Sequence, residues 1–384
     1  MFKSRKFSYF YPNKMNSGLG VYSRSGVSAN LKATHMTQKI IIATTLFLMT
    51  LASFAQTDKA AALIDEGIAL YDQGKYAEAI DKYKQSYLLD SNSVILFAEM
   101  SMTYLALKDF DNTESICQRA IAKFPDNNGL KNIYTTYGNS LDERQKPEEA
   151  LKIYIAGLNK FPDYYMLQFN KGITEYGLKR NYDSRTSFQN AIKLNPKHAS
   201  SYYYLGIIED NFENRIPAIL ALSRFMILEP KGKRAEIILP YLTKKVNNMY
   251  YQVKTGNSTA TMSSAKTRTD TTANSFEKVE FGILVIETTS SLFPEKEKQT
   301  DLEKFEIKSQ TIFEYLKAYK KDNSGFYWDF LAPYFIDLES QKYVKTFTYY
   351  INYYVTDDKD VEKWFKKNEK NVDKFFDWSK YYKW

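Results

Sequence analysis

The chain has 384 residues, with 53 Lys or Arg, 45 Asp or Glu, two His and one Cys, and its formal net charge is +8. A charge of this size would indicate a nucleic-acid or anionic-membrane partner if it were spread over the folded protein. It is not, because residues 1–55 hold seven basic residues and no acidic one, which leaves 46 basic against 45 acidic residues. No nucleic-acid partner is therefore expected. The Cys and His counts also argue against disulfides, His-cluster zinc sites and Cys-His nucleophiles.

An apolar run near the N-terminus predicts an export signal. Residues 40–55 (IIIATTLFLMTLASFA) carry no charge, follow Lys39 and end in a small-x-small pattern, as secretory signal peptides do. Their sixteen residues would span only about 24 Å of a ~30 Å hydrocarbon core as a helix. A cleavable signal is therefore favoured over a membrane anchor. We assign 1–55 to an N-terminal extension with a signal peptide at 36–55, and expect the mature chain to begin near Gln56.

A period of 34 residues runs through the next part of the chain, at 60–232. Five copies share a small residue, a bulky or apolar residue and, in all but the first, a closing proline. This pattern resembles the tetratricopeptide repeat. The resemblance implies pairs of antiparallel helices that stack into an all-α superhelical solenoid. The small residues are Gly67, Ser101, Gly138, Gly172 and Gly206, the bulky or apolar ones are Tyr83, Cys117, Tyr154, Phe188 and Leu222, and the prolines are Pro125, Pro162, Pro196 and Pro230.

The spacing also predicts how the helices pack. We expect the small residues of each first helix to meet small residues of the second, so that the two backbones approach closely. The bulky residues would then fill the interface with the next repeat. Because the last repeat of a stacked array needs a cap, the apolar spacing that follows predicts a capping helix at 233–252. The small residues of the second helices are Ser86, Ala120, Gly157 and Ala191.

The rest of the chain has a different composition. Residues 253–275 are rich in Ser and Thr and predict a linker or loop. Residues 276–384 carry Phe, Tyr and Trp at helical spacings, which predicts an aromatic-rich C-terminal helical domain whose rings form a core. Its last helix is expected to follow one apolar stripe from Val361 to Phe376. The aromatic residues beyond that stripe, expected to be exposed or to dock back on this helix, are Tyr381, Tyr382 and Trp384.

The family resemblance implies a concave groove lined by the first helices. The inward positions include no Lys or Arg, which disfavours capture of an acidic C-terminal tail. They are apolar and aromatic, with an Asn available to bond a backbone amide, and suit an apolar peptide or helix. The alternative that the C-terminal helices of the same chain occupy this groove stays open. The residues predicted to bind a partner are Tyr71, Met102, Asn139, Phe169, Tyr176 and Tyr203.

These observations together predict an exported, non-catalytic interaction or scaffold protein, periplasmic or associated with the cell envelope. The partner is expected to be a protein or peptide, with a possible place in an envelope complex. No enzyme activity, cofactor, metal site or stable membrane span after cleavage is expected. The alternative is a glycan-binding component of a surface polysaccharide uptake system. That alternative lacks the lipidated Cys of such proteins, because no Cys follows the apolar run at the cleavage site.

Overall fold

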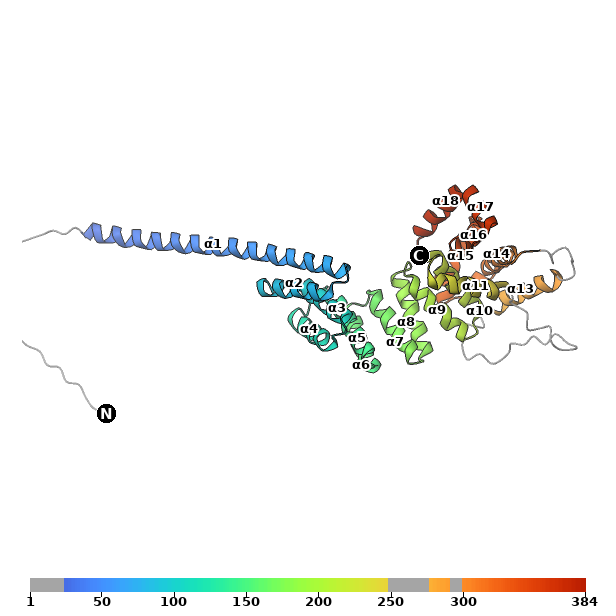
Figure 1. Ribbon diagram of the computed structural model, residues 1–384, viewed down its shortest axis with the longest axis horizontal. Helices are drawn as coiled ribbons and strands as arrows, with labels where there is room; N and C mark the ends of the chain where they lie inside the picture. The colour runs from blue at the N-terminus through green and yellow to red at the C-terminus, as the bar shows by residue number, and fades with distance from the viewer. Residues whose placement is uncertain (1–23, 248–275, 291–298) are drawn as a thin grey trace, which may run out of the picture.

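The computed structural model describes residues 24–247, 276–290 and 299–384, and every regular element in these ranges is helical (Figure 1). Helix pairs stack along the chain and lead into a group of C-terminal helices. The prediction of an all-α solenoid followed by further helices is therefore confirmed. The predicted linker at 253–275 lies outside the described residues, and the domain boundaries proposed from the sequence remain predictions.

The first helix, α1 (Arg24–Asp72), projects away from the rest of the molecule (Figure 1). Its apolar side chains between Met36 and Met49 are exposed, whereas Ala60 and Ile64 are buried. Among the described helices, only the stretch Met36–Asp72 is long and apolar enough to cross a membrane. A signal sequence meets the same criterion, so export remains a prediction.

Five helix pairs make up the array, and each first helix packs on the second helix of its own pair. Local chemistry sets several of the helix ends. The Asp109 carboxylate accepts a hydrogen bond from the backbone N–H of Asn112 (3.2 Å), and Pro147 occupies the first turn of its helix, where no N–H is needed. After α1, the helices are α2 (Tyr76–Leu89), α3 (Val94–Ala106), α4 (Phe110–Lys123), α5 (Leu130–Glu143), α6 (Pro147–Lys160), α7 (Tyr165–Gly177), α8 (Asn181–Leu194), α9 (Ala199–Asn211), α10 (Arg215–Leu228) and the following α11 (Lys233–Asn247).

The turn inside each pair has a residue with left-handed backbone. The five residues have φ between 58° and 76°. In the second repeat the N–H of Lys108 donates to Leu105 O (2.8 Å) and that of Asp109 to Tyr104 O (2.9 Å), which satisfies carbonyls at the end of α3. Only one of the five is a glycine, so four side chains accept a conformation that glycine adopts more readily. The five are Gly74, Lys108, Gln145, Lys179 and Glu213.

Each of the four glycines among the repeated small residues of the first helices faces a bulky residue of the second helix in the same repeat. A Cβ atom on Gly138 would lie 2.2 Å from Tyr154 Cε1, and one on Gly67 would lie 2.3 Å from Tyr83 Cε1. The prediction that small residues meet small residues was wrong. Two small residues face to face would leave a void, whereas a small residue against a ring gives close packing. The bulky residues do reach the next repeat, as predicted: the ring of Phe188 stacks on that of Tyr204 in α9, with ring centroids 5.4 Å apart.

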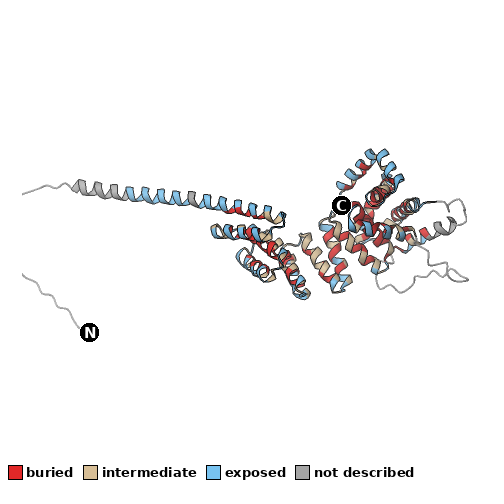
Figure 2. Ribbon diagram, viewed as in Figure 1, coloured by how far each residue is buried: buried red, intermediate tan, exposed pale blue. Residues whose placement is uncertain are grey.

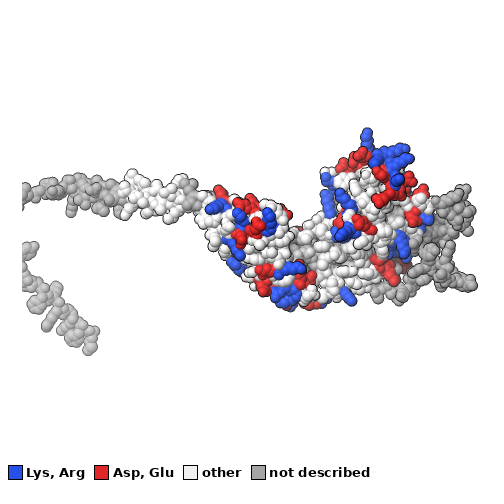
Figure 3. All heavy atoms as spheres, viewed as in Figure 1, with Lys and Arg blue, Asp and Glu red and all other residues white. Residues whose placement is uncertain are grey.

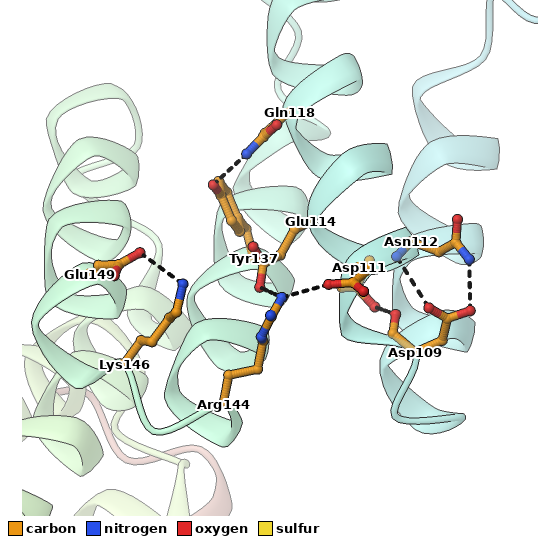
Figure 4. Close-up of polar contacts among 10 residues, drawn as sticks. Asp109, Asp111, Asn112, Glu114, Gln118, Tyr137, Arg144, Lys146 and Glu149 are labelled. Carbon is orange, nitrogen blue, oxygen red and sulfur yellow. Dashed lines mark hydrogen bonds and ion pairs between the residues drawn. The ribbon is translucent and has the colours of Figure 1, made fainter.

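Polar contacts join neighbouring repeats at intervals close to the repeat length. Arg144, just after α5, reaches back to Asp111 (2.8 Å) and Glu114 (3.1 Å) of α4, as Figure 4 shows. One repeat further on, Arg180 pairs with Glu148 at 2.5 Å. Exposed ion pairs of this kind contribute about 0 to 1 kcal/mol each. They orient adjacent repeats, while the buried side chains provide most of the stability.

The C-terminal helices are short and aromatic. The predicted last helix is two helices, which meet at Asn368, because the Asn368 side-chain amide donates to Trp364 O (2.8 Å) and ends the first of them. Phe376, predicted to share the apolar stripe, is 47% exposed. The elements are α13 (Glu277–Ser290), α14 (Asp301–Tyr319), the 3₁₀ turn η3 (Lys320–Asp322), the π-helical turn η4 (Tyr327–Leu331), α15 (Ala332–Ser340), α16 (Val344–Tyr353), α17 (Lys359–Lys367) and α18 (Glu369–Lys380).

These helices attach chiefly to α10 and α11, at the end of the array. Buried residues continue from the array into the C-terminal helices without a break at this junction (Figure 2). Arg224 of α10 is buried, donates to Ser379 Oγ (2.9 Å) and lies 4.4 Å from the ring centroid of Tyr334. The buried Glu209 of α9 accepts a hydrogen bond from Tyr327 Oη at 2.5 Å. The C-terminal helices therefore form a fixed continuation of the last repeat.

The terminal aromatic residues dock more widely than predicted. Trp384 stacks on Tyr334 of α15, with ring centroids 5.2 Å apart and an interplanar angle of 5°. Tyr382 contacts Trp378 of the preceding helix, as expected, but its hydroxyl also donates to Asp337 of α15 (2.7 Å). Tyr381 is 68% exposed. The end of the chain thus closes over α15, because that helix presents the buried rings on which a Trp can stack.

Candidate functional site

A cavity of about 440 Å³ lies where first helices of neighbouring repeats come together. Its longest side is one face of α5, along which lining residues recur every three or four positions. The ends of α1 and α3 and the start of α7 complete it. From α5 come Asn132, Thr135, Thr136, Asn139 and Glu143, and from the flanking segments come Tyr71, Met102, Leu105, Ala106, Lys108, Tyr164 and Met166.

The cavity has two chemically different sides. Tyr71, Met102 and Leu105 give it an apolar side, and the Thr and Asn side chains of α5 give it a polar, uncharged one. One Lys and one Glu, Lys108 and Glu143, are the charged members of the lining. Such a surface suits a ligand with an apolar group and a hydrogen-bonding backbone, because it offers apolar contact beside polar groups that carry no charge.

Asn139 is held in a defined orientation. Its Oδ1 accepts a hydrogen bond from Tyr154 Oη at 2.7 Å. Burial raises the pKa of Tyr154, so the hydroxyl stays protonated and remains the donor. Within the described part of the chain, the Nδ2 of Asn139 has no hydrogen-bond acceptor. Asn139 is therefore set to donate to a carbonyl oxygen of a ligand.

Only half of the predicted binding residues line this cavity. Tyr71, Met102 and Asn139 do so. Phe169 and Tyr176 instead belong to an aromatic cluster on α7 and α9: the ring of Phe169 lies 4.6 Å from that of His198, and that of Tyr176 lies 5.9 Å from that of Tyr204. The structure therefore does not bring the six residues together in one site.

Tyr203, the sixth predicted residue, is also in this second region. Its ring lies 5.2 Å from that of Phe225, and the guanidinium of Arg234 lies 5.2 Å from its centroid. Asp210 lies about two helical turns after Tyr203 on α9. Its carboxylate accepts hydrogen bonds from Tyr241 Oη and Lys245 Nζ of α11. Helix α11 thus takes the place of a further first helix and covers this end of the array.

Two lining residues that sequence reasoning missed lie in turns. Lys108 follows α3, and Tyr164 precedes α7, where its hydroxyl donates to Asn132 Oδ1 (2.8 Å). All of the predicted inward positions lie on helices. The prediction of a lining without basic residues was wrong, because Lys108 contributes to it. Lys108 could have been found from the repeat period, because it lies 34 residues after Gly74 and occupies the same position in the turn.

The side chains with the greatest chemical reactivity lie outside the cavity. Cys117 is buried, and this burial raises the pKa of its thiol to about 12, so the thiol stays protonated. His198 bonds Ser201 Oγ at 2.8 Å, and burial together with the nearby Arg234 lowers the pKa of its imidazole. The described residues contain no group of three or more His, Cys, Asp and Glu that is placed to hold a metal ion.

Stacked helix pairs with a groove along their first helices define a helical-repeat solenoid, a class of binding protein. Within that class, the tetratricopeptide-repeat family model matches residues 60–93, which form the first of the five copies. The match supports the tetratricopeptide resemblance for this copy, and the structure shows the stacked helix pairs that the sequence pattern predicted for all five.

Several solved structures resemble the chain. PilF of Pseudomonas aeruginosa is 17% identical, with a TM-score of 0.44 over 50% of this chain and 85% of that one. YrrB, a TPR protein with an unusual peptide-binding site, is 17% identical, with a TM-score of 0.37 over 51% and 97%. The first TPR of Spaghetti (RPAP3) bound to the HSP90 peptide SRMEEVD is 29% identical, with a TM-score of 0.30 over 32% and 95%. No curated protein matches the chain.

Proposed function

We propose that this chain is an exported, non-catalytic interaction protein that binds a segment of a partner protein in the cavity along α5. The observation that carries the proposal is the cavity itself, with Tyr71, Met102 and Asn139 brought to it from three successive first helices. Its volume of about 440 Å³ falls within the range of about 300 to 1,000 Å³ that is common for ligand pockets. The C-terminal helices attach at the other end of the array, which leaves this cavity accessible.

The cavity chemistry favours an uncharged, partly apolar peptide segment. An apolar side chain of the partner would lie against Tyr71, Met102 and Leu105, and a backbone carbonyl would accept a hydrogen bond from Asn139 Nδ2. Two of the similar proteins bind peptides: YrrB has an unusual peptide-binding site, and the first TPR of RPAP3 is bound to an HSP90 peptide. A place in an envelope complex follows if the leader at 36–55 directs export.

No observation in the described ranges favours the glycan-binding alternative. A sugar ring needs the free face of an aromatic side chain. The predicted candidates already contact other side chains: Phe169 packs on Phe188 and His198, and Tyr203 lies beside Arg234 and Phe225. Saturable binding to an oligosaccharide panel would nevertheless revive that alternative.

Site-specific photocrosslinking tests the cavity. A benzoylphenylalanine at Leu105, in the lining, should crosslink one defined partner, whereas the same group at Ile155, exposed on the second helix α6, should not. The identified partner segment, made as a peptide, should bind at least tenfold more weakly to Met102→Glu than to the parent. The matched variant Ile155→Glu should bind like the parent. Equal crosslinking at both positions would contradict the proposal.

Export is tested separately. N-terminal sequencing of the protein recovered from the cell envelope should give a chain that begins near Gln56. A chain that begins at Met1 or Met36 in the cytoplasm would reject the export proposal and leave the peptide-binding proposal standing.

A further inference from the structure

We propose that the outer surface of α17 and α18 docks on an anionic lipid bilayer. The surface is defined by five lysines within twelve residues, Lys363, Lys366, Lys367, Lys370 and Lys374, and we call it the lysine patch. Glu369 and Asp373 lie between them in sequence, and the two helices together carry seven lysines against five acidic residues. The chain from residue 56 onward has 46 basic and 45 acidic residues, so the excess of two lysines on these helices is local.

The lysines of the patch face solvent and are mostly unpaired. All five are exposed, and Figure 3 shows Lys and Arg side chains gathered over α17. Lys366 pairs with Glu362 at 2.5 Å. Within the described ranges the ammonium groups of the other four have no acidic residue within ion-pair distance. Their charge is therefore available to an external anion.

Aromatic packing fixes the patch in place. On the inner side of α17, Trp364 stacks on Tyr349 with ring centroids 4.2 Å apart, and Phe365 stacks on Tyr353 at 3.7 Å. On α18, Phe375 is fully buried. The apolar sides of both helices therefore pack into the core, and the lysines on their other sides face solvent.

Exposed aromatic residues and a lysine from the array adjoin the patch. Phe376 is 47% exposed and Tyr381 is 68% exposed, both on or just after α18. Lys231, in the turn after α10, places its Nζ 5.6 Å from the ring centroid of the exposed Tyr354, which also contacts Phe365. Lysines beside exposed aromatic rings match the headgroup region of a membrane, where both side-chain types are favoured.

The shape of this surface favours a bilayer over an acidic peptide. A peptide tail needs a groove, and neither of the two cavities described on this chain is lined by a patch lysine. A bilayer instead presents a broad anionic surface that several outward lysines meet at once. Each such lysine strengthens binding to an anionic surface by about fivefold.

Vesicle co-sedimentation of the full chain tests this inference. The probe is a vesicle of equal parts phosphatidylglycerol and phosphatidylcholine, compared with phosphatidylcholine alone. Changing Lys363, Lys367, Lys370 and Lys374 together to Gln should lower the partition coefficient for anionic vesicles at least tenfold. Binding to neutral vesicles, to which the apolar part of α1 contributes equally in every variant, should not change.

Two controls make the outcome decisive. Four exposed lysines elsewhere, changed together to Gln, remove the same net charge and should leave anionic-vesicle binding within about threefold of the parent. The Lys→Arg version of the patch should bind like the parent. Equal losses from the patch and control variants, or binding to soluble dextran sulfate but not to anionic vesicles, would overturn the proposal. The control lysines are Lys84, Lys152, Lys197 and Lys244.

Discussion

The repeat array and the C-terminal helices contain the same turn but pack their helices differently. Between α15 and α16, Lys342 has φ 60°, its N–H donates to Glu339 O (2.8 Å), and that of Tyr343 donates to Leu338 O (2.9 Å). The bonds of Lys108 and Asp109 in the second repeat have the same spacing and the same lengths. Yet α15 packs on α14, and α16 packs on α14 and α17, instead of forming a close pair.

One position explains the difference. Seven residues before the left-handed residue, every repeat has Gly or Ser, and in the four repeats with Gly a bulky residue of the second helix lies on it. Seven residues before Lys342 the chain has Phe335, whose ring is buried and lies 4.9 Å from that of Phe313 in α14. A Phe at this position keeps the following helix away. The turn therefore reverses the chain, and the small residue decides whether the two helices close on each other.

The largest effect is expected from Phe335→Ala. Removing this buried ring leaves a void beside Phe313 and should lower the free energy of unfolding by about 4 kcal/mol. Urea denaturation followed by circular dichroism measures the change. The matched variant Phe376→Ala, at a 47% exposed ring, should cost less than about 1 kcal/mol. Equal costs at the two positions would contradict the role given to Phe335.

A smaller loss is expected from Gly138→Ala. The added Cβ would lie 2.2 Å from Tyr154 Cε1, so the ring must shift, at a cost of about 2 kcal/mol. Gly177→Ala is the control, because nothing lies within 4 Å of its added Cβ. At that site Ala should be neutral or should stabilise by up to about 1 kcal/mol. A harmless Gly138→Ala would show that the close glycine–ring contact is not what holds the pair together.

The smallest effects are expected at the shared turn. Lys108→Gly and Lys342→Gly each relieve a left-handed backbone and should stabilise the protein by about 0.5 to 1 kcal/mol. The reverse change, Gly74→Lys, should destabilise it by a similar amount. Thermal unfolding measures all three. If Lys108→Gly stabilises the protein and Lys342→Gly does not, the two turns differ in backbone strain although their hydrogen bonds are alike.

Periodicity allowed the array to be predicted from the sequence, because small and bulky residues recur in five copies at a spacing of 34 residues, or 37 in one case, and four of the copies end in a proline. It did not reveal which residues face each other, since Gly138 and Tyr154 belong to different helices and their contact depends on the turn between them. It also missed the break at Asn368, where the apolar spacing continues from Phe365 to Val372 although a side-chain hydrogen bond ends the helix.

The candidate site was predictable only in part, for a similar reason. Tyr71, Met102 and Asn139 lie on helices, so the repeat spacing locates them on the inner face. Lys108 and Tyr164 lie in turns, which helical spacing does not cover. The ring of Phe169 contacts rings on other helices, and these contacts form only when the helices pack. A sequence pattern within one helix therefore does not predict them.

Helix α1 gives the chain a mechanical property as well as a wall of the cavity. It runs without interruption from Met49, within the apolar segment, to Tyr71 in the cavity lining, about 33 Å at the usual helical rise. While this helix is intact, a force on its apolar end would be transmitted directly to the cavity. Cleavage before Gln56 would remove this mechanical connection but leave the part of α1 that lines the cavity in place. The new N-terminus would be held against α2, because Gln56 Nε2 donates to Leu89 O (3.0 Å).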